Sequence, residues 1–463
     1  MFEGKRVAVV GLARSGKAAA IKLAKDGAIV TIYDNSPFEK FADEILELIE
    51  MGITVYCGTN EIELEETDII IVSPGIPPVL PFFAEAREMG IEIISEIELA
   101  YRLSPCPIIG ITGTNGKTTT TVMTGKILKE AGIDYFIGGN VAGYETSLVC
   151  KDREGVPLIS CVDKAIKSSV IACEISTFQL EECHKFRPKS AALLNVGTDH
   201  LDRHGTREIY ANLKAKIFAF QRKEDIAVLN ADDDFVHGLK DKLISEVFLF
   251  SLEKEVEKGC FLRGDDIIFR QDKFADDITI MKTADLKVIG RHNIANAMAA
   301  ILLTIPFGIS SKLMKQALSK FAGVTHRLEY IKTINGVDYI NNSMCTNVEA
   351  GESSVMAIDR PQIVICGGKD KGSDFTSFAK AVNKKAKSAI IIGADKDKIA
   401  ESFDKEGFKN YTKSETLKEA LDIAKSQTKS GDVVVLTPVC ASFDMFTSFE
   451  DRGNTFKELV FEL

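Results

Sequence analysis

The sequence predicts an α/β protein built from three consecutive domains, and three observations support this fold class. The chain has 463 residues, which is enough for about three domains of roughly 150 residues each. Short apolar runs alternate with helix-like segments, as in parallel sheets with crossover helices. Glycine-rich turns follow two of these runs, which is typical of nucleotide sites in such sheets.

The first block, residues 1–103, is expected to be a Rossmann-like domain that binds the nucleotide part of a substrate. Its helices are predicted at residues 18–26 and 41–51, and its strands at residues 6–10, 28–33, 53–56, 68–72 and 91–94. Pro105 and Pro107 then interrupt the pattern. We therefore place the first domain boundary near Ser104.

The second and third blocks repeat this alternation. Residues 104–323 are expected to form a central P-loop ATPase-like α/β domain that opens with a strand at residues 107–111. Residues 324–463 are expected to form a C-terminal Rossmann-like α/β domain, with a helix at residues 414–426 and strands at residues 337–341, 362–366, 388–392 and 432–437. A hinge between these two blocks is expected within residues 323–327.

Composition argues against several classes of protein. Hydrophobic residues make up 45% and charged residues 27% of the chain, as in soluble globular proteins. A net charge of −10 and a pI of about 5.4 argue against binding to nucleic acid or to an anionic membrane. The N-terminus lacks the pattern of a signal peptide and no apolar run reaches about 18 residues, so we expect a cytoplasmic protein.

The ten cysteines are scattered without a C-x-x-C pair, which favours buried thiols over disulfides or a zinc site.

The most informative motif is the turn at residues 110–121, which reads GITGTNGKTTTT. Its glycines let backbone N–H groups face a phosphate, and the N-terminus of the following helix adds partial positive charge. Lys117 can span the β- and γ-phosphates of ATP, and Thr118 can bind Mg²⁺. Ile111 stands where the general phosphate-loop pattern has glycine, but the lysine and four threonines have no evident packing role. We therefore predict that this loop binds ATP.

The loop at residues 11–16, GLARSG, gives a more ambiguous nucleotide signal. Asp34 ends the second predicted strand about twenty residues later, as in a dinucleotide-binding unit. Ala13 replaces the glycine that would let the backbone approach a pyrophosphate, which weakens the case for NAD. The loop then either serves helix–sheet packing alone or holds another nucleotide through the polar side chains of Arg14, Ser15 and Asn35.

Two later segments place polar side chains after apolar runs. Glu174 ends the run at residues 169–174, and its position relative to Lys117 favours a Mg²⁺ ligand, although the segment alone is equally consistent with a helix start. His200 and His204 lie in the polar loop at residues 195–205. A metal- or substrate-binding role and a solvated surface position both remain open for a histidine there.

Taken together, these motifs resemble the Mur ligase family, the cytoplasmic ATP-dependent amide-bond ligases of peptidoglycan synthesis. The resemblance covers essentially the whole chain, through residues 11–16, 73–77, 110–121, 174–180, 195–205, 290–296, 438–446 and 452–453. It implies an enzyme of cell-wall biogenesis, and hence of cell shape and division, that joins D-glutamate to UDP-N-acetylmuramoyl-L-alanine through an acyl phosphate and releases ADP and phosphate. It also implies a monomer that uses ATP and two Mg²⁺ ions.

The resemblance further implies a role for each matching residue. The residues expected to contact ATP are Gly113, Thr114, Asn115, Gly116, Lys117, Thr118, Thr119, Asn293, Asn296 and Arg327. The expected metal ligands are Thr118, Glu174, His200 and, if it carries a carbamate rather than remaining unmodified, Lys214. Lys117, Glu174, His200 and Lys214 would be the catalytic set. UDP-N-acetylmuramoyl-L-alanine would contact Arg14, Ser15, Asp34, Asn35, Ser73, Gly75 and Asn140. D-glutamate would contact Thr346, Lys371, Ser442 and Phe449.

The chain departs from the family pattern in three places. The third-domain motif D-S-K-[GA]-T-N reads NSMCTN at residues 342–347, so Asn342 replaces a carboxylate and Met344 replaces a lysine. Residues 144–154 form an insertion beside the expected acceptor site, and Gly197-Thr198 replaces Thr-Pro. Two interpretations stay open: the D-glutamate-adding ligase, or a paralogue with another amino acid, such as L-glutamate, or another acceptor. The separate ATP loop and the residue at position 13 argue against a dehydrogenase.

Overall fold

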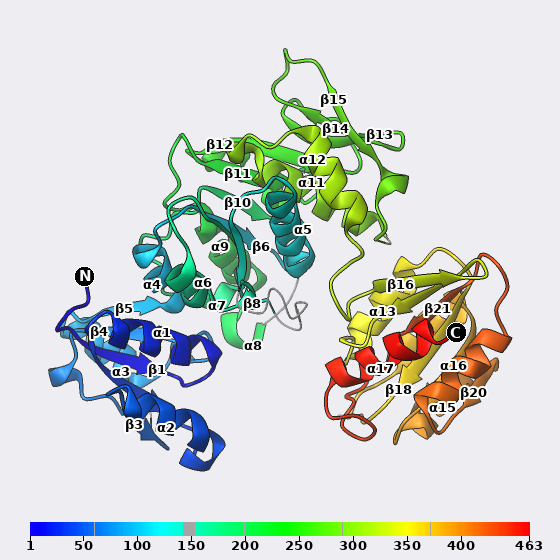
Figure 1. Ribbon diagram of the computed structural model, residues 1–463, viewed down its shortest axis with the longest axis horizontal. Coiled ribbons are helices and arrows are strands. Elements are labelled where there is room, and N and C mark those ends of the chain that lie inside the picture. The colour runs from blue at the N-terminus through cyan, green and yellow to red at the C-terminus, as the bar shows by residue number, and fades with distance from the viewer. Residues whose placement is uncertain (60, 142–152, 198–200, 289, 371) are drawn as a thin grey trace. The chain divides into compact units, whose positions relative to one another are not determined.

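The computed structural model describes residues 1–59, 61–141, 153–197, 201–288, 290–370 and 372–463. It contains three sheets, drawn in blue, in cyan to green, and in yellow to red in Figure 1. The chain divides into two compact units, Met1–Thr283 with Ala295–Leu318, and Ala284–Ile294 with Ser319–Leu463. The first unit holds two of the sheets and the second unit holds the third. The predicted α/β class with three sheet domains is confirmed, whereas the boundaries near residues 103 and 323 stay predictions.

The first sheet is entirely parallel, with strand order β3-β2-β1-β4-β5. Its strands are β1 (Arg6–Val10), β2 (Ile29–Asp34), β3 (Thr54–Cys57), β4 (Ile69–Val72) and β5 (Glu92–Ser95). Its helices are α1 (Arg14–Lys25), α2 (Ala42–Glu50), α3 (Pro81–Glu88) and α4 (Glu96–Leu103). The chain leaves β1 toward β2 on one side and returns through β4 on the other. The loops after β1 and β4 therefore emerge side by side, where ligands bind in open parallel sheets.

The central sheet has ten strands in the order β15-β14-β13-β12-β11-β10-β6-β9-β7-β8. Eight neighbouring strands of this sheet, from β8 at one edge to β13, pair in parallel. They are β6 (Ile108–Thr112), β7 (Tyr135–Gly139), β8 (Glu154–Val156), β9 (Val170–Glu174), β10 (Ser190–Leu193), β11 (Ile226–Asn230), β12 (Glu246–Ser251) and β13 (Gly259–Arg263). An antiparallel ribbon, not anticipated from the sequence, extends one edge through β14 (Asp266–Arg270) and β15 (Ile278–Lys282).

The helices between these strands are α5 (Lys117–Glu130), α6 (Leu158–Lys164), α7 (Thr177–Leu180), α8 (Leu201–His204), α9 (Arg207–Ala215) and α10 (Asp234–His237), followed by α11 (Arg291–Leu303) and α12 (Ser311–Lys320). Helix α5 packs on β6, β7 and β9 and is almost fully buried. Its burial fixes the direction in which its N-terminus points, which is toward the turn after β6. That turn is the predicted ATP loop.

The third sheet has the order β16-β17-β21-β18-β19-β20, parallel except for the β16–β17 pair. Its strands are β16 (Glu329–Ile334), β17 (Val337–Asn341), β18 (Gln362–Gly367), β19 (Ala386–Ile392), β20 (Tyr411–Lys413) and β21 (Val433–Leu436). Its helices are α13 (Val348–Ala357), α14 (Thr376–Lys385), α15 (Lys396–Lys405), α16 (Leu417–Ser426) and α17 (Phe449–Phe461). Because successive residues of a strand face opposite sides, β18 and β21 contribute to two cores, one under α13 to α15 and one under α16 and α17.

Helix α4 joins the first sheet domain to the central one. The Glu98 carboxylate on α4 accepts hydrogen bonds from the backbone N–H groups of His184 (3.1 Å) and Lys185 (3.0 Å) in the central domain. The Glu96 carboxyl accepts one from the Ile159 N–H (2.7 Å) in the first turn of α6. Both glutamates are fully buried. These contacts give the first two domains a shared, hydrogen-bonded core.

Two expectations about the class of protein can be compared with the structure. Among the cysteines in the described ranges, all are free and only Cys57 and Cys106 are partly exposed, as expected for buried thiols. Within those same ranges, no helix combines the length and the apolar character that a membrane span requires.

Candidate active site

The predicted ATP loop connects β6 to α5, and its backbone depends on two glycines. Gly113 (φ +156°) and Gly116 (φ +84°) adopt conformations that side chains with a Cβ rarely reach. The Lys117 ammonium donates to the backbone oxygens of Gly113 (3.0 Å) and Thr114 (2.9 Å). Lys117 thus lies over the loop, next to the N-terminus of α5. This is the arrangement in which a lysine and backbone N–H groups can share a triphosphate.

The threonines after Lys117 have different roles. The Thr118 hydroxyl donates to the Glu174 carboxylate (2.7 Å), and both side chains are buried. Thr120 and Thr121 are fully buried inside the central domain, and the Thr121 hydroxyl donates to the Lys117 backbone oxygen (2.9 Å). The expectation that the threonines have no packing role was therefore wrong for these two. Thr119 is also buried.

The chemistry of Thr118 and Glu174 fits one Mg²⁺ ion, because a hydroxyl and a carboxylate oxygen side by side are the ligands that a hard cation prefers. Lys214 on α9 is 2% exposed, and its amine donates to the Gly113 oxygen (2.9 Å) and lies 4.3 Å from the centre of the Tyr210 ring. A carbamate on this amine would place oxygen atoms beside the loop. His200 lies outside the described residues, and within the described ranges no group of three or more His, Cys, Asp or Glu side chains is placed to hold a metal.

The segment after β10 supports the ATP loop, a role that the sequence did not reveal. The Asn115 N–H donates to the Asn195 side chain (2.8 Å), whose amide donates to the Asn115 oxygen (3.1 Å). The Thr114 hydroxyl accepts from the Gly197 N–H (2.8 Å) and lies 3.3 Å from the Tyr210 hydroxyl. These hydrogen bonds join the ATP loop to the segment after β10.

The residues expected near adenine and the phosphates are distributed over both units. Asn296 on α11 is buried, and a Cβ added at Gly116 would overlap its side-chain oxygen, so Asn296 packs directly on the loop. Asn293 and Arg327 fall in the second compact unit, where Asn293 is buried and Arg327 is exposed. The structure therefore brings Asn296 to the predicted loop within one unit.

In the first domain, the loops after β1 and β4 are held together. The Ser73 hydroxyl donates to the Gly11 oxygen (3.0 Å), and the Asp34 carboxylate accepts from the N–H groups of Leu12 (2.6 Å) and Ser36 (2.7 Å). Burial raises the pKa of Asp34, but the hydrogen bonds from Leu12 and Ser36 and the charge of Lys40 together lower it more, so the pKa lies below its ordinary value. Asp34 thus fixes the loop geometry as an anion.

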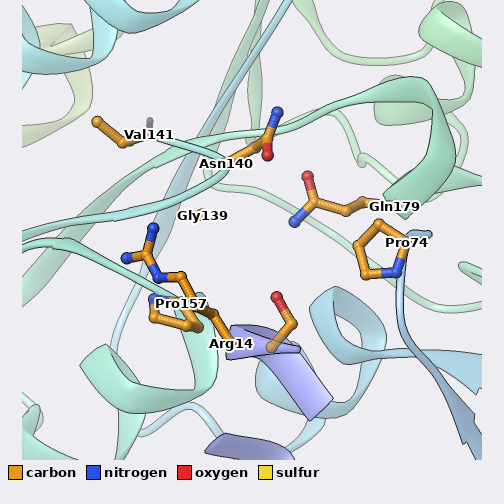
Figure 2. Close-up of a pocket in the computed structure, with 8 residues that line it drawn as sticks. Arg14, Pro74, Gly139, Asn140, Val141, Pro157 and Gln179 are labelled. Atoms are coloured by element: carbon orange, nitrogen blue, oxygen red, sulfur yellow. The ribbon is translucent and has the colours of Figure 1, made fainter. Parts of the chain in front are cut away.

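A pocket of about 110 Å³ lies between these loops and the central domain (Figure 2). Its lining residues are Arg14, Ser15 and Pro74 from the first domain and Gly139, Asn140, Val141, Pro157 and Gln179 from the central domain. Three of them were predicted for the acceptor, namely Arg14, Ser15 and Asn140. Asn35 and Gly75 are exposed and are not among the lining residues.

Gln179 was not assigned to the site from the sequence, although Figure 2 shows its amide projecting into the pocket. Its side-chain oxygen accepts from the Ser176 N–H (2.9 Å), and the Ser176 hydroxyl accepts from the Gln179 N–H, which forms a capping box. The Ser-x-x-Gln spacing was therefore an available signal. Arg14 reaches across the pocket, where its guanidinium donates to the Gly155 oxygen (2.6 Å).

His204 and Arg203 lie in α8, directly after the predicted metal residue at position 200. His204 is buried, with its Nε2 3.0 Å from the Thr177 hydroxyl, so a solvated surface position is wrong for this histidine. Arg203 donates to Glu181 (2.6 Å) and to the Ile76 oxygen (2.8 Å) of the first domain. Arg203 thus connects α8 to the loop after β4.

In the third domain, two of the expected D-glutamate residues, Thr346 and Ser442, lie in the loops after β17 and β21, and Phe449 begins α17. Ser442 is buried, Thr346 and Phe449 are half-buried, and Lys371 lies outside the described residues. The chain's departure at Asn342 is accommodated locally, because its side chain accepts from the Leu328 N–H (3.1 Å) and donates to the Ser354 hydroxyl (2.9 Å). An amide at this position therefore satisfies one donor and one acceptor.

Comparison with known proteins adds to this geometry. Three family models match the chain: the MurD-like N-terminal domain of Mur ligases at residues 5–95, the Mur ligase middle domain at residues 111–304, and the glutamate ligase domain of Mur ligases at residues 326–440. The UDP-N-acetylmuramoylalanine--D-glutamate ligase of Pelotomaculum thermopropionicum is 40% identical over 467 residues, covering 100% of this chain and 98% of its own. The enzyme of that name from Koribacter versatilis is 42% identical over 458 residues, covering 99% and 97%.

Solved structures show the same fold at lower identity. The UDP-N-acetylmuramate-alanine ligase MurC of Thermotoga maritima matches with a TM-score of 0.59 at 19% identity, covering 99% of each chain. The UDP-N-acetylmuramoylalanyl-D-glutamyl-2,6-diaminopimelate--D-alanyl-D-alanyl ligase of Acinetobacter baumannii matches with a TM-score of 0.57 at 16% identity, covering 94% of this chain and 90% of that one. The full-length relatives and the three matching domains together show that the chain belongs to the Mur ligase family.

Proposed function

We propose that this protein is an ATP-dependent ligase that joins D-glutamate to UDP-N-acetylmuramoyl-L-alanine in the synthesis of a peptidoglycan precursor. The observation that carries this proposal is the match, at about 40% identity and over the whole chain, to ligases named for that reaction. The ATP loop around Lys117, the acceptor pocket around Arg14 and the strand-end loops around Ser442 support it.

ATP would bind at the N-terminus of α5, with Lys117 and the backbone N–H groups of residues 113–119 on its phosphates. Thr118 and Glu174 would hold one Mg²⁺ ion, and Glu174, His200 and a carbamylated Lys214 would hold a second. Bound Mg²⁺ supplies positive charge that offsets the charge of the triphosphate. Lys117 would contribute a further positive charge where negative charge spreads in the transition state.

The reaction would proceed in two displacements. A carboxylate oxygen of the alanyl group attacks the γ-phosphorus of ATP, and the bond between the γ-phosphorus and the β–γ bridging oxygen breaks. ADP departs, and an acyl phosphate forms on the acceptor. The uncharged amine of D-glutamate then attacks the acyl carbon, the amine loses a proton, and phosphate departs as the amide forms. The pocket between the first and central domains would hold the acceptor through Arg14, Ser15, Asn140 and Gln179, so that water has little access to the acyl phosphate.

We also propose the domain extents 1–103, 104–323 and 324–463, with the acceptor nucleotide, ATP and the amino acid as their respective ligands. Because the proposed reaction consumes ATP, we expect it to take place in the cytoplasm. A monomer is proposed as well, because each substrate has its expected residues within one chain.

The test is phosphate release by the purified protein with ATP, Mg²⁺ and UDP-N-acetylmuramoyl-L-alanine. Parallel reactions contain D-glutamate, L-glutamate, D-aspartate, lysine or no amino acid. Release that requires D-glutamate supports the proposal and shows that Asn342 and Met344 are tolerated. Release with a different amino acid, or with none, would replace the proposal with that of a paralogue.

A further inference from the structure

Arg452 in the first turn of α17 is a buried guanidinium whose partners are uncharged. The side chain is 1% exposed. Its Nε donates to the Ser343 hydroxyl (2.9 Å), its Nη2 donates to the Ser343 backbone oxygen (2.9 Å), and its Nη1 donates to the Cys440 backbone oxygen (3.1 Å). No carboxylate in the described ranges forms an ion pair with it at 4.0 Å or less. Arg452 is therefore a buried cation held by neutral oxygens.

Such an arrangement is unfavourable in the isolated protein. Buried charges are normally paired, because removing an ion from water has a large free-energy cost that hydrogen bonds to neutral groups offset only in part. Burial lowers the pKa of Arg452 to about 10, so the group still carries its charge at neutral pH. The Asp444 carboxylate, which favours the charged form of Arg452, accepts the Ala394 N–H (2.8 Å) instead. A buried cation without an ion pair suits a site that receives an anion.

The place of Arg452 in the sheet supports a ligand. It lies where the carboxyl ends of β17, β21 and β18 meet, which is where ligands bind in open parallel sheets. The loops after these strands are joined by hydrogen bonds from the Val439 N–H to the Cys345 oxygen (2.9 Å) and from the Lys369 N–H to the Ala441 oxygen (2.9 Å). A Cβ added at Gly368, in the loop after β18, would lie 3.3 Å from Arg452 Nη1. One cation thus lies under all three loops.

These loops carry residues expected at the amino-acid site. Thr346 follows β17, Ser442 follows β21, and Phe449 begins α17, where its backbone oxygen accepts from the Ser343 hydroxyl (2.8 Å). An amino acid with two carboxylates needs positive charge nearby. Met344 provides none at the position where the family pattern has lysine.

We propose that Arg452 is the positioning residue that makes this site selective for an amino acid with a second carboxylate. Arg452 holds the loops that carry Thr346 and Ser442. Its positive charge stabilises a bound dianionic amino acid between these loops electrostatically, without direct contact between the two. The inference rests on the proposed function.

The test compares D-glutamate with D-glutamine, which lacks the second negative charge, in the phosphate-release assay. The variants are Arg452→Met, which removes the charge, and Arg452→Lys, which keeps it. Arg360→Met is the matched control, because Arg360 is exposed, lies just before the amino end of β18 and pairs with Asp338. KM is measured for each amino acid, for ATP and for the acceptor, and folding is checked by circular dichroism.

We expect Arg452→Met to lower the preference for D-glutamate over D-glutamine at least tenfold, about 1.4 kcal/mol, with the KM values for ATP and acceptor changed less than twofold. Arg452→Lys and Arg360→Met should keep the preference within threefold of the wild type. An unchanged preference in folded Arg452→Met would overturn the inference, as would equal losses for all substrates. If Arg452→Met does not fold, loss of the preference in folded Arg452→Lys overturns it, and retention supports it. A wild-type protein without D-glutamate-dependent release would refute the proposed function and the inference with it.

Discussion

Replacing Glu96 by glutamine removes a buried carboxyl whose ionisation opposes folding. Burial raises the pKa of Glu96 from its ordinary value of 4.5 to about 7, although the hydrogen bond from the Ile159 N–H lowers it in part. The second carboxyl oxygen is buried without a hydrogen-bond partner. The neutral form is therefore the one that the fold accommodates.

The magnitude follows from the two pKa values. Below pH 4.5 the carboxyl is protonated in the folded and unfolded chains alike, so it has no effect on the pH dependence. Between pH 4.5 and about 7 the unfolded chain releases the proton while the folded chain keeps it, so stability falls as pH rises. At roughly 1.4 kcal/mol per pH unit, the complete loss above pH 7 is about 3 kcal/mol. About 2 kcal/mol of this loss falls between pH 5.5 and 8.5.

The assay is chemical unfolding of wild type and Glu96→Gln from pH 5.5 to 8.5. Glutamine keeps the acceptor for Ile159 and cannot ionise, so the variant should gain about 2 kcal/mol relative to wild type across this range. Glu98→Gln is the control of opposite sign. It removes the negative charge that pairs with Arg102 (2.8 Å) and leaves one oxygen where two accept from Arg102, His184 and Lys185, so it should lose about 3 kcal/mol at both ends of the range. A difference between Glu96→Gln and wild type that stays constant with pH would refute the argument.

Three further outcomes are expected. In Gly16→Ala, the new Cβ would overlap the Gly11 oxygen, so thermal unfolding should show a free energy of unfolding lower by about 3 kcal/mol. The control is Gly75→Ala, which has open space around its Cβ and should change the free energy of unfolding by less than about 0.5 kcal/mol. Equal effects of the two substitutions would contradict this geometry. Lys117→Met should lower kcat for phosphate release at least ~100-fold with an unchanged circular dichroism spectrum, and retained activity would remove Lys117 from the site. With ¹³C-bicarbonate, a carbamate signal should appear in the ¹³C NMR spectrum of the wild type and be absent from Lys214→Met; a wild type without the signal would end the carbamate proposal.

The strands of the first sheet, and β17, β18, β19 and β21 of the third, could be predicted mainly because most of them are buried on both faces. Strands such as β4 (Ile69–Val72) and β18 (Gln362–Gly367) are buried along their whole length and read as continuous apolar runs. The antiparallel ribbon of β14 and β15 was missed because one of its faces meets solvent. In β15 only two of the five residues are buried, and a mixed segment of that kind does not stand out in the sequence.

The same distinction applies to the site. The spacing of Gly113, Gly116 and Lys117 is local, so the sequence by itself indicates a phosphate loop. Tyr210 reaches Thr114 from 96 positions away, and no local pattern announces that contact. The role of Arg452 is missed for a related reason. It depends on which groups surround the guanidinium in space, and a sequence does not show that the oxygens of Ser343 and Cys440 that accept its hydrogen bonds are neutral.

Helix α4 has a practical consequence for dividing the chain into pieces. Glu96 and Glu98 accept N–H groups of Ile159, His184 and Lys185, so a fragment that starts at residue 104 would leave three backbone donors without these acceptors. Each buried donor left unpaired costs about 1–3 kcal/mol, which is a large share of the stability of a domain. A cut after residue 323 lies beyond the end of α12 at Lys320 and breaks no such bond across α4. We therefore expect residues 1–323 to keep the first two sheets folded for NMR or crystallisation.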